Sequence, residues 1–79
     1  MANSMSSVVI GRRQILRELK KNNVREIIIA TDAEAQYISS LIEVAKQSGV
    51  AYKLNGTMNE ISAQYHIDVP SGAVGILKA

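Results

Sequence analysis

The chain alternates short apolar runs with longer stretches of helical periodicity, and this order limits the folds that it can adopt. The apolar runs lie at 8–10, 26–30, 50–54 and 73–77. The second run, "EIIIA", is uninterrupted and rich in β-branched residues, which is typical of a strand buried on both faces. Strands that alternate with helices predict one sheet with helices packed on it. Because each connection carries a helix, the pattern by itself predicts a largely parallel sheet.

The segment at 11–21 has the spacing of an amphipathic helix. Ile15, Leu16 and Leu19 share one side of it and predict a stripe that is buried against the sheet. The Asn pair at 22–23 should end the helix, since Asn tolerates the left-handed conformation that often follows a last turn.

Two further helix starts are predicted by the spacing of a capping box, in which Thr or Ser lies three residues before Glu. Thr31 and Glu34 have this spacing and predict a helix that ends near position 48. Thr57 and Glu60 have it again and predict a shorter helix up to about Tyr65. The inner face of the longer helix should consist of Ala35, Ile38, Leu41, Ile42 and Ala45.

The length of 79 residues allows one small domain, which we place at 8–79 after a short flexible lead at 1–7. The absence of Cys excludes disulfides, thiolate zinc sites and cysteine nucleophiles, and it fits a reducing cytoplasm. No apolar run approaches the ~20 residues that a membrane span needs. The lead "MANSMSS" lacks the basic start and long apolar stretch of a signal peptide. We therefore expect a cytoplasmic protein with no membrane partner.

Catalytic chemistry finds little support in the sequence. His66 is the only histidine, and a catalytic triad needs a base held beside a nucleophile by a third group. Asp32 follows a strand, at the end where open α/β sheets often bind ligands, but capping of the following helix is the simpler explanation. Neither a Walker nor a Rossmann glycine motif is present. We expect no enzyme activity, no metal and no cofactor, and an enzyme that uses Asp32 or His66 is the weakest alternative.

Positive charge is concentrated in the first third of the chain. Residues 1–25 hold six of the nine Lys and Arg residues and one of the seven acidic residues, which gives this segment a net charge of +5. The rest of the chain sums to −3. A concentrated basic segment in a near-neutral domain indicates a polyanionic partner. From composition alone, a solvated helix face rich in Lys and Arg is an equally good explanation.

The basic residues open a helix directly after a glycine. Gly11 permits the close approach of another backbone, and Arg12 and Arg13 follow it at the end of the helix whose dipole repels cations. Arg17 lies one turn after Arg13, and Gln14 adds an amide that can both donate to and accept from a base. Guanidinium groups bind phosphates and guanine edges. Only three tyrosines are present, none of them in this segment, so structured RNA recognised by its shape is favoured over base stacking.

The stretch "VVIGRRQILRELKKNNVREIIIATDAE", together with the later "HIDVPSGAVGIL", resembles the ribosomal protein L seven Ae / L thirty e superfamily, whose members bind RNA kink-turns. The shared pattern is a glycine followed by a basic or polar tripeptide that opens a helix, then a basic linker, then a run like that at 27–33. It covers about residues 8–79, and the resemblance is strongest to small bacterial members from Firmicutes. It implies a three-layer α/β/α sandwich with a mixed four-stranded sheet, in place of a largely parallel one.

The resemblance also implies which residues touch RNA. In the family, the residues after the glycine enter a widened groove beside tandem sheared G·A pairs, and a basic residue one turn later supports them. The loop before the last strand packs against the flipped-out nucleotide and the backbone of the bulge. With Lys20 from the same basic helix, the expected RNA-binding residues are Gly11, Arg12, Arg13, Gln14, Arg17, Lys20, Val69, Pro70, Ser71 and Gly72.

The chain departs from the family pattern at this tripeptide. Archaeal members carry Thr, Asn and Glu where this chain has Arg12, Arg13 and Gln14. The change replaces a carboxylate acceptor by a weaker amide acceptor and shifts the balance toward phosphate contacts. Pro70 removes a backbone N–H from the last loop. Only seven residues precede Val8, so the family's N-terminal helix should have almost no counterpart, and one sheet face should be less covered or be covered by another molecule.

One hypothesis and one alternative follow from these residues. We expect a non-enzymatic, ribosomal-protein-like RNA-binding protein that recognises a kink-turn or a similar bent internal loop. It should be a monomer, with the ribosome as a candidate partner. The alternative is a protein-interaction or small-ligand module on the same fold that has lost RNA binding.

Overall fold

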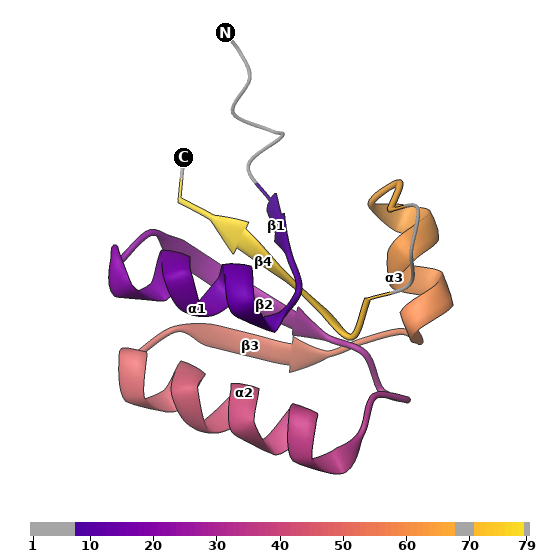
Figure 1. Cartoon of the computed structure of the whole chain (residues 1–79), viewed down its shortest axis with the longest axis horizontal. Helices are drawn as coiled ribbons and strands as arrows, with labels where there is room; N and C mark the ends of the chain where they lie inside the picture. The colour runs from indigo at the N-terminus through magenta and orange to yellow at the C-terminus, as the bar shows by residue number, and fades with distance from the viewer. Residues whose placement is uncertain (1–7, 68–70, 79) are drawn as a thin grey trace, which may run out of the picture.

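The computed structural model describes residues 8–67 and 71–78, which form a mixed four-stranded sheet between two helical layers (Figure 1). The strands are β1 (Val8–Ile10), β2 (Val24–Ile29), β3 (Ala51–Leu54) and β4 (Ala73–Leu77), and the helices are α1 (Arg12–Lys20), α2 (Ala35–Ser48) and α3 (Met58–Gln64). The expected element order and three-layer arrangement are confirmed. The expected lead at 1–7 and the expected sites Val69 and Pro70 lie outside the described residues.

The sheet is mixed because the last strand enters between two strands that run the other way. The strand order is β1-β4-β2-β3, with β2 parallel to β3 and β4 antiparallel to both of its neighbours. β1, β2 and β3 therefore share one direction, which fits the helical crossovers α1 and α2 between them. A largely parallel sheet, as the alternating pattern alone predicted, is wrong at β4. α3 lies on the opposite face of the sheet from α1 and α2, and the chain returns from it as an antiparallel strand.

α1 and α2 cover one face of the sheet and bury the larger apolar core. Ile15 of α1 and Leu41 of α2 are fully buried there, as their spacing predicted. Leu16 and Leu19 are half-buried beside them. Ala35, expected on the inner face, is exposed because it is the first residue of α2. Within the described residues, neither these helices nor α3 is long and apolar enough to cross a membrane.

α3 covers only part of the opposite face. Its Ile61 is buried against Ile28 of β2 and Val74 of β4. Ile10, at the end of the edge strand β1, is 43% exposed. The smaller apolar cluster lies on the face that α3 covers.

Of the two expected capping boxes, one is present in the structure and the other is not. At the start of α3 the box is confirmed, since Thr57 Oγ1 accepts from the Glu60 N–H at 3.2 Å and Glu60 Oε1 accepts from the Thr57 N–H at 2.8 Å. The box expected at Thr31 and Glu34 is wrong, and α2 begins only after Glu34. Thr31 is engaged elsewhere, because its N–H and its hydroxyl both donate to the Gly56 carbonyl, at 2.8 and 3.2 Å.

Candidate nucleic-acid interface

The start of α1 and the start of β4 meet at one corner of the sheet. The Gly11 N–H donates to the Ala73 carbonyl at 3.0 Å, and the Ala30 N–H, just after β2, donates to the Gly72 carbonyl at 2.8 Å. The Ser71 hydroxyl donates to the same Ala73 carbonyl at 3.1 Å. The expected helix start and the described part of the expected last loop are therefore held side by side.

Gly11 has a backbone conformation that favours glycine. Its φ is 89° and its ψ is 157°, in a region that side chains with a Cβ rarely enter. This conformation lets the chain pass from β1 into α1 without an intervening loop. No described side chain caps the start of α1, so its first backbone N–H groups are free to meet an anion.

Gly75 of β4 determines how closely α1 lies on the sheet. A Cβ at this position would lie 3.0 Å from Cγ1 of Ile15, which is tighter than packed cores normally allow. Because Ile15 is fully buried over this glycine, the opposite side of α1 is turned outward. Arg13, Gln14 and Arg17 are exposed on that side, as the helical spacing predicted.

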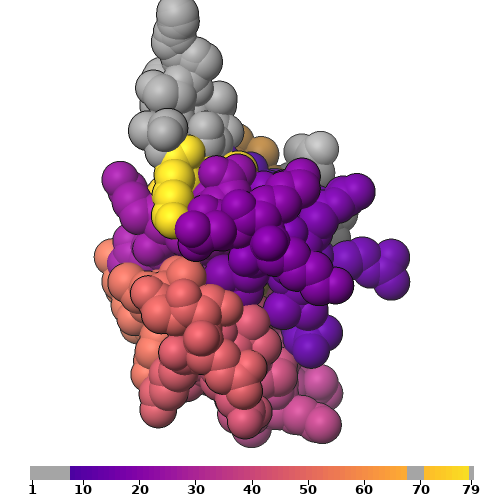
Figure 2. All heavy atoms as spheres, turned by 90° about the vertical axis from the view of Figure 1, so that its left-hand side faces the viewer, coloured from indigo at the N-terminus to yellow at the C-terminus, as the bar shows by residue number. Residues whose placement is uncertain are grey.

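The outward side of α1 carries a group of cations that we call the basic surface. Arg12, Arg13, Arg17 and Lys20 are all exposed and line a hollow of about 350 Å³, together with half-buried Leu16. Among the described residues, none of the four cations forms an ion pair. Figure 2 shows indigo and violet side chains from this part of the chain standing out from the body of the molecule.

Two hydrogen bonds orient side chains at the basic surface. Arg12 Nε donates to Ser40 Oγ at 3.2 Å, and this contact draws Arg12 toward α2. Arg17 Nη1 donates to Gln14 Oε1 at 3.5 Å. The oxygen of the Gln14 amide therefore faces a cation, and its NH₂ group is directed away from that cation.

The one carboxylate of α1 belongs to the far end of the helix. Glu18 Oε1 accepts from Asn23 Nδ2 at 2.9 Å, and Glu18 Oε2 lies 3.5 Å from Lys21 Nζ. The hydrogen bond from Asn23, helped by the charge of Lys21, holds the pKa of Glu18 below its ordinary value. Asn22 next to this cluster has a φ of 57°, as expected for an Asn that follows the end of a helix.

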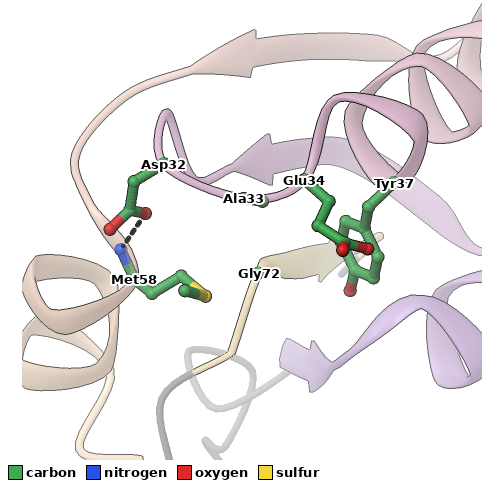
Figure 3. A pocket seen from close by; sticks show the side chains of 6 residues that line it. All are labelled: Asp32, Ala33, Glu34, Tyr37, Met58 and Gly72. Carbon is green, nitrogen blue, oxygen red and sulfur yellow. Dashed lines mark hydrogen bonds between the residues drawn. The ribbon is translucent and has the colours of Figure 1, made fainter.

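A second hollow, of about 240 Å³, lies beside the last loop (Figure 3). Met58 and Tyr37 stand on opposite sides of it, with Gly72 between them. The Tyr37 ring packs so closely on Gly72 that a Cβ there would lie 2.8 Å from its Cε1. No local pattern in the sequence points to Tyr37 or Met58, because only the tertiary fold brings them to Gly72. The hollow is lined by Asp32, Ala33, Glu34, Tyr37, Met58 and Gly72.

Asp32 and His66, which we weighed as catalytic residues, have other positions. Asp32 Oδ1 accepts from the Met58 N–H at 2.9 Å. It therefore holds the start of α3, and our expectation that it caps the following helix, α2, is wrong. His66 is exposed just beyond α3, with a φ of 57°. No three His, Asp or Glu side chains within 8–67 and 71–78 gather closely enough to hold a metal ion.

Comparison with known sequences finds small bacterial relatives. A protein of Bacillus pumilus named RNA-binding protein is 31% identical over 71 residues, which are 90% of this chain and 87% of the relative. The RNA-binding protein YbxF of Geobacillus stearothermophilus is also 31% identical over 71 residues, with the same two shares. No protein-family model matches the chain.

Solved structures of lower identity share the fold. The 15.5kD RNA binding protein of Giardia lamblia superimposes with a TM-score of 0.85 at 23% identity and covers 96% of this chain. This chain spans just under two thirds, 64%, of the Giardia protein. A protein of unknown function from Bacillus halodurans also gives a TM-score of 0.85, at 15% identity, over 100% of this chain and 88% of that protein. At these identities the likeness shows the fold alone.

Proposed function

The chain belongs to the family of small bacterial proteins named RNA-binding protein, and on this basis we propose that it recognises a kink-turn or a similar bent internal loop in RNA. The observation that carries the proposal is the 3.0 Å hydrogen bond from Gly11 to Ala73. It joins the exposed basic start of α1 to the first residue of β4, next to the loop that contains Ser71 and Gly72, so two segments far apart in the sequence form one surface. The proposal also places the family within the L seven Ae / L thirty e superfamily.

A bent internal loop suits this surface because it presents two features at once, a widened groove and unpaired nucleotides. We assign the groove to the start of α1, where Arg13 and Gln14 are exposed and backbone N–H groups are free. Arg17 and Lys20, further along the helix, bind the phosphates that flank the groove. The bulge meets the loop at Ser71 and Gly72.

The hollow beside Gly72 is proposed to receive the flipped-out nucleotide. Its walls include the Tyr37 ring and the Met58 thioether, which offer apolar surface to a base. The carboxylates of Asp32 and Glu34 also line it. These groups accept hydrogen bonds and repel phosphate, so they favour a base edge over the RNA backbone in this place.

The proposal assigns no reaction to the chain. The Asp32 carboxylate is used to hold the start of α3, and His66 stands exposed beyond that helix, so neither is placed as a member of a catalytic group. We propose a monomeric, non-enzymatic, cytoplasmic protein whose candidate partners include the ribosome.

A binding titration with two RNAs tests the function. One RNA carries a generic kink-turn with tandem G·A pairs, and the other is the same RNA with those pairs replaced by Watson–Crick pairs. We expect clearly tighter binding to the kink-turn. No binding below ~10 μM at low salt, where phosphate contacts are strongest, would contradict the proposal and favour a protein-interaction or small-ligand module. Equal affinity for both RNAs would contradict kink-turn recognition.

A further inference from the structure

Asn55 lies directly before Gly56 in the turn that joins β3 to α3. The side-chain amide of an asparagine can be attacked by the backbone nitrogen of the next residue. Glycine hinders this attack least, because it has no side chain. Gly56 has a φ of 88°, a conformation that glycine adopts readily, and Asn55 is exposed to water. The fold therefore requires the glycine and leaves a reactive pair of residues at the surface.

The backbone nitrogen of Gly56 has no hydrogen-bond partner within 8–67 and 71–78. The nitrogens that follow two other asparagines are engaged. The N–H after Asn22 donates to the Glu18 carbonyl at 3.0 Å, and the N–H after Asn59 donates to the side chain that caps α3 at 3.2 Å. Asn23 uses its own amide, since its Nδ2 donates to Glu18 Oε1 at 2.9 Å, and a β-branched residue follows it. Asn55 is therefore the described asparagine that is best placed to react.

The carbonyl of Gly56 holds one side of the hollow beside Gly72. It accepts from both the N–H and the hydroxyl of Thr31, at 2.8 and 3.2 Å. One residue earlier, the Ala30 N–H donates to the Gly72 carbonyl at 2.8 Å. One residue later, Asp32 lines the hollow and accepts from the first N–H of α3 (Figure 3). A change in the main chain at Gly56 thus acts on the segment that carries one wall of the hollow.

From this geometry we infer that Asn55 is a site of spontaneous deamidation in the folded protein, and that isoaspartate formed there releases Thr31 from Gly56. The Gly56 nitrogen gives up its proton and bonds to Cγ of Asn55, and the NH₂ group leaves with a proton as ammonia. Water then opens the resulting succinimide at one of its two carbonyls, which gives aspartate or isoaspartate. The reaction consumes water alone.

The two products differ in the path of the main chain. In aspartate the backbone is unchanged and the side chain carries a carboxylate. In isoaspartate the main chain runs through Cγ and gains a methylene group, so the carbonyl of Gly56 is displaced. Because that one oxygen accepts both hydrogen bonds from Thr31, its displacement weakens both. The modification itself does not depend on RNA binding, whereas its effect on the hollow as an RNA site rests on the proposed function.

Incubation of the protein at 37 °C and alkaline pH tests the site. Peptide mapping by mass spectrometry measures, at each asparagine, the small gain in mass when OH replaces NH₂, in folded protein and in urea. We expect Asn55 to react in the folded protein at close to its rate in urea. Asn22 and Asn59 should react more slowly in the folded protein than in urea. Protection of Asn55 by folding to the same degree as Asn22 and Asn59 would overturn the inference.

The isoaspartate form, separated from the aspartate form by chromatography, tests the release of Thr31. Asn55→Asp is the matched control, because it carries the new charge on an unchanged backbone. The Tm of the isoaspartate form should be lower than that of Asn55→Asp by at least about 4 °C, the shift expected for loss of one average hydrogen bond in a domain of this size. Equal Tm values would overturn the release of Thr31.

Two variants and one RNA complete the design. Asn55→Gln, whose longer side chain closes the equivalent ring far more slowly, should keep its Tm during the incubation, and Asn59→Gln should lose it as the unmodified protein does. A loss in both variants would overturn the assignment to Asn55. The isoaspartate form should bind kink-turn RNA less tightly than Asn55→Asp, and equal affinities would overturn the link to the hollow. Failure of fresh protein to bind any structured RNA would contradict the proposed function and leave the modification, measured by mass and Tm, standing.

Discussion

Arg17→Ala should lower the salt dependence of RNA binding by about one phosphate contact. Four cations line the basic surface, and each phosphate contact contributes ~0.7 to 0.9 to the magnitude of the slope of log K against log salt, so the unmodified protein should show a slope of about −2.8 to −3.6. Doubling the salt concentration should then weaken binding roughly 7- to 12-fold. With Arg17 removed, the slope should become shallower, about −2.1 to −2.7. The affinity should drop by similar factors for all structured RNAs, because phosphate contacts carry no sequence information.

The matched control for this variant is Arg25→Ala. Arg25 belongs to the same basic segment of the sequence and is exposed on β2, but it does not line the basic surface. Titration of a labelled kink-turn RNA over a series of KCl concentrations gives the slope for each protein. A flat salt response of the unmodified protein, or equal reductions of the slope in both variants, would refute the assignment. The cations of α1 would then be a solvated helix face.

Substitutions at three further positions, Asp32, Asn23 and Gly72, test contacts within the fold. Asp32→Ala removes the acceptor for the first N–H of α3 and should cost about 0.5–2 kcal/mol, measured by thermal unfolding, while Asp32→Asn keeps an acceptor and should cost less. Asn23→Ala removes the hydrogen bond that lowers the pKa of Glu18. A carboxylate whose pKa is lower in the folded than in the unfolded state stabilises the fold at pH values above the unfolded-state pKa. This stabilisation is lost as the pH falls through the folded-state pKa. The difference in Tm between Asn23→Ala and the unmodified protein should therefore be full at neutral pH and shrink below about pH 4.3, and a difference independent of pH would contradict this. Gly72→Ala forces a methyl group toward the Tyr37 ring and should cost about 1–3 kcal/mol, a loss that Tyr37→Ala in the same chain should reduce; simple additivity of the two would contradict the contact.

The sequence predicted the elements better than it predicted how they are joined. The strands at 8–10 and 73–77 have their predicted bounds, because apolar runs next to glycines and loops are local signals. The direction of β4 is not a local property, since it is set by pairing with β1 and β2, which lie far away in the sequence. The start of α2 was misplaced for a similar reason. Thr31 and Asp32 form hydrogen bonds to the segment around Gly56 and Met58, which the spacing between Thr31 and Glu34 does not reveal.

The exposed half of the candidate site was predictable, and its construction was not. Helical periodicity places Arg13 and Arg17 opposite Ile15, so burial of the isoleucine exposes both cations. The close contact of Tyr37 with Gly72 joins distant parts of the chain and leaves no local pattern. The contact of the exposed cations of α1 with RNA remains a prediction, which the salt titration of Arg17→Ala tests.

We propose that the arginine pair at the start of α1 serves binding and not stability. Arg13 forms no ion pair among the described residues, and it lies where the helix dipole disfavours a cation, at a cost of about 0.3–1 kcal/mol. Arg13→Gln keeps the length and polarity of the side chain, so the free protein should become more stable. For a domain of this size the gain corresponds to an increase in Tm of roughly 1 to 8 °C. The same variant should bind kink-turn RNA less tightly and with a smaller salt slope. A loss of both stability and affinity would mean that Arg13 serves the fold, and the explanation of the arginine pair by an arriving RNA backbone would be wrong.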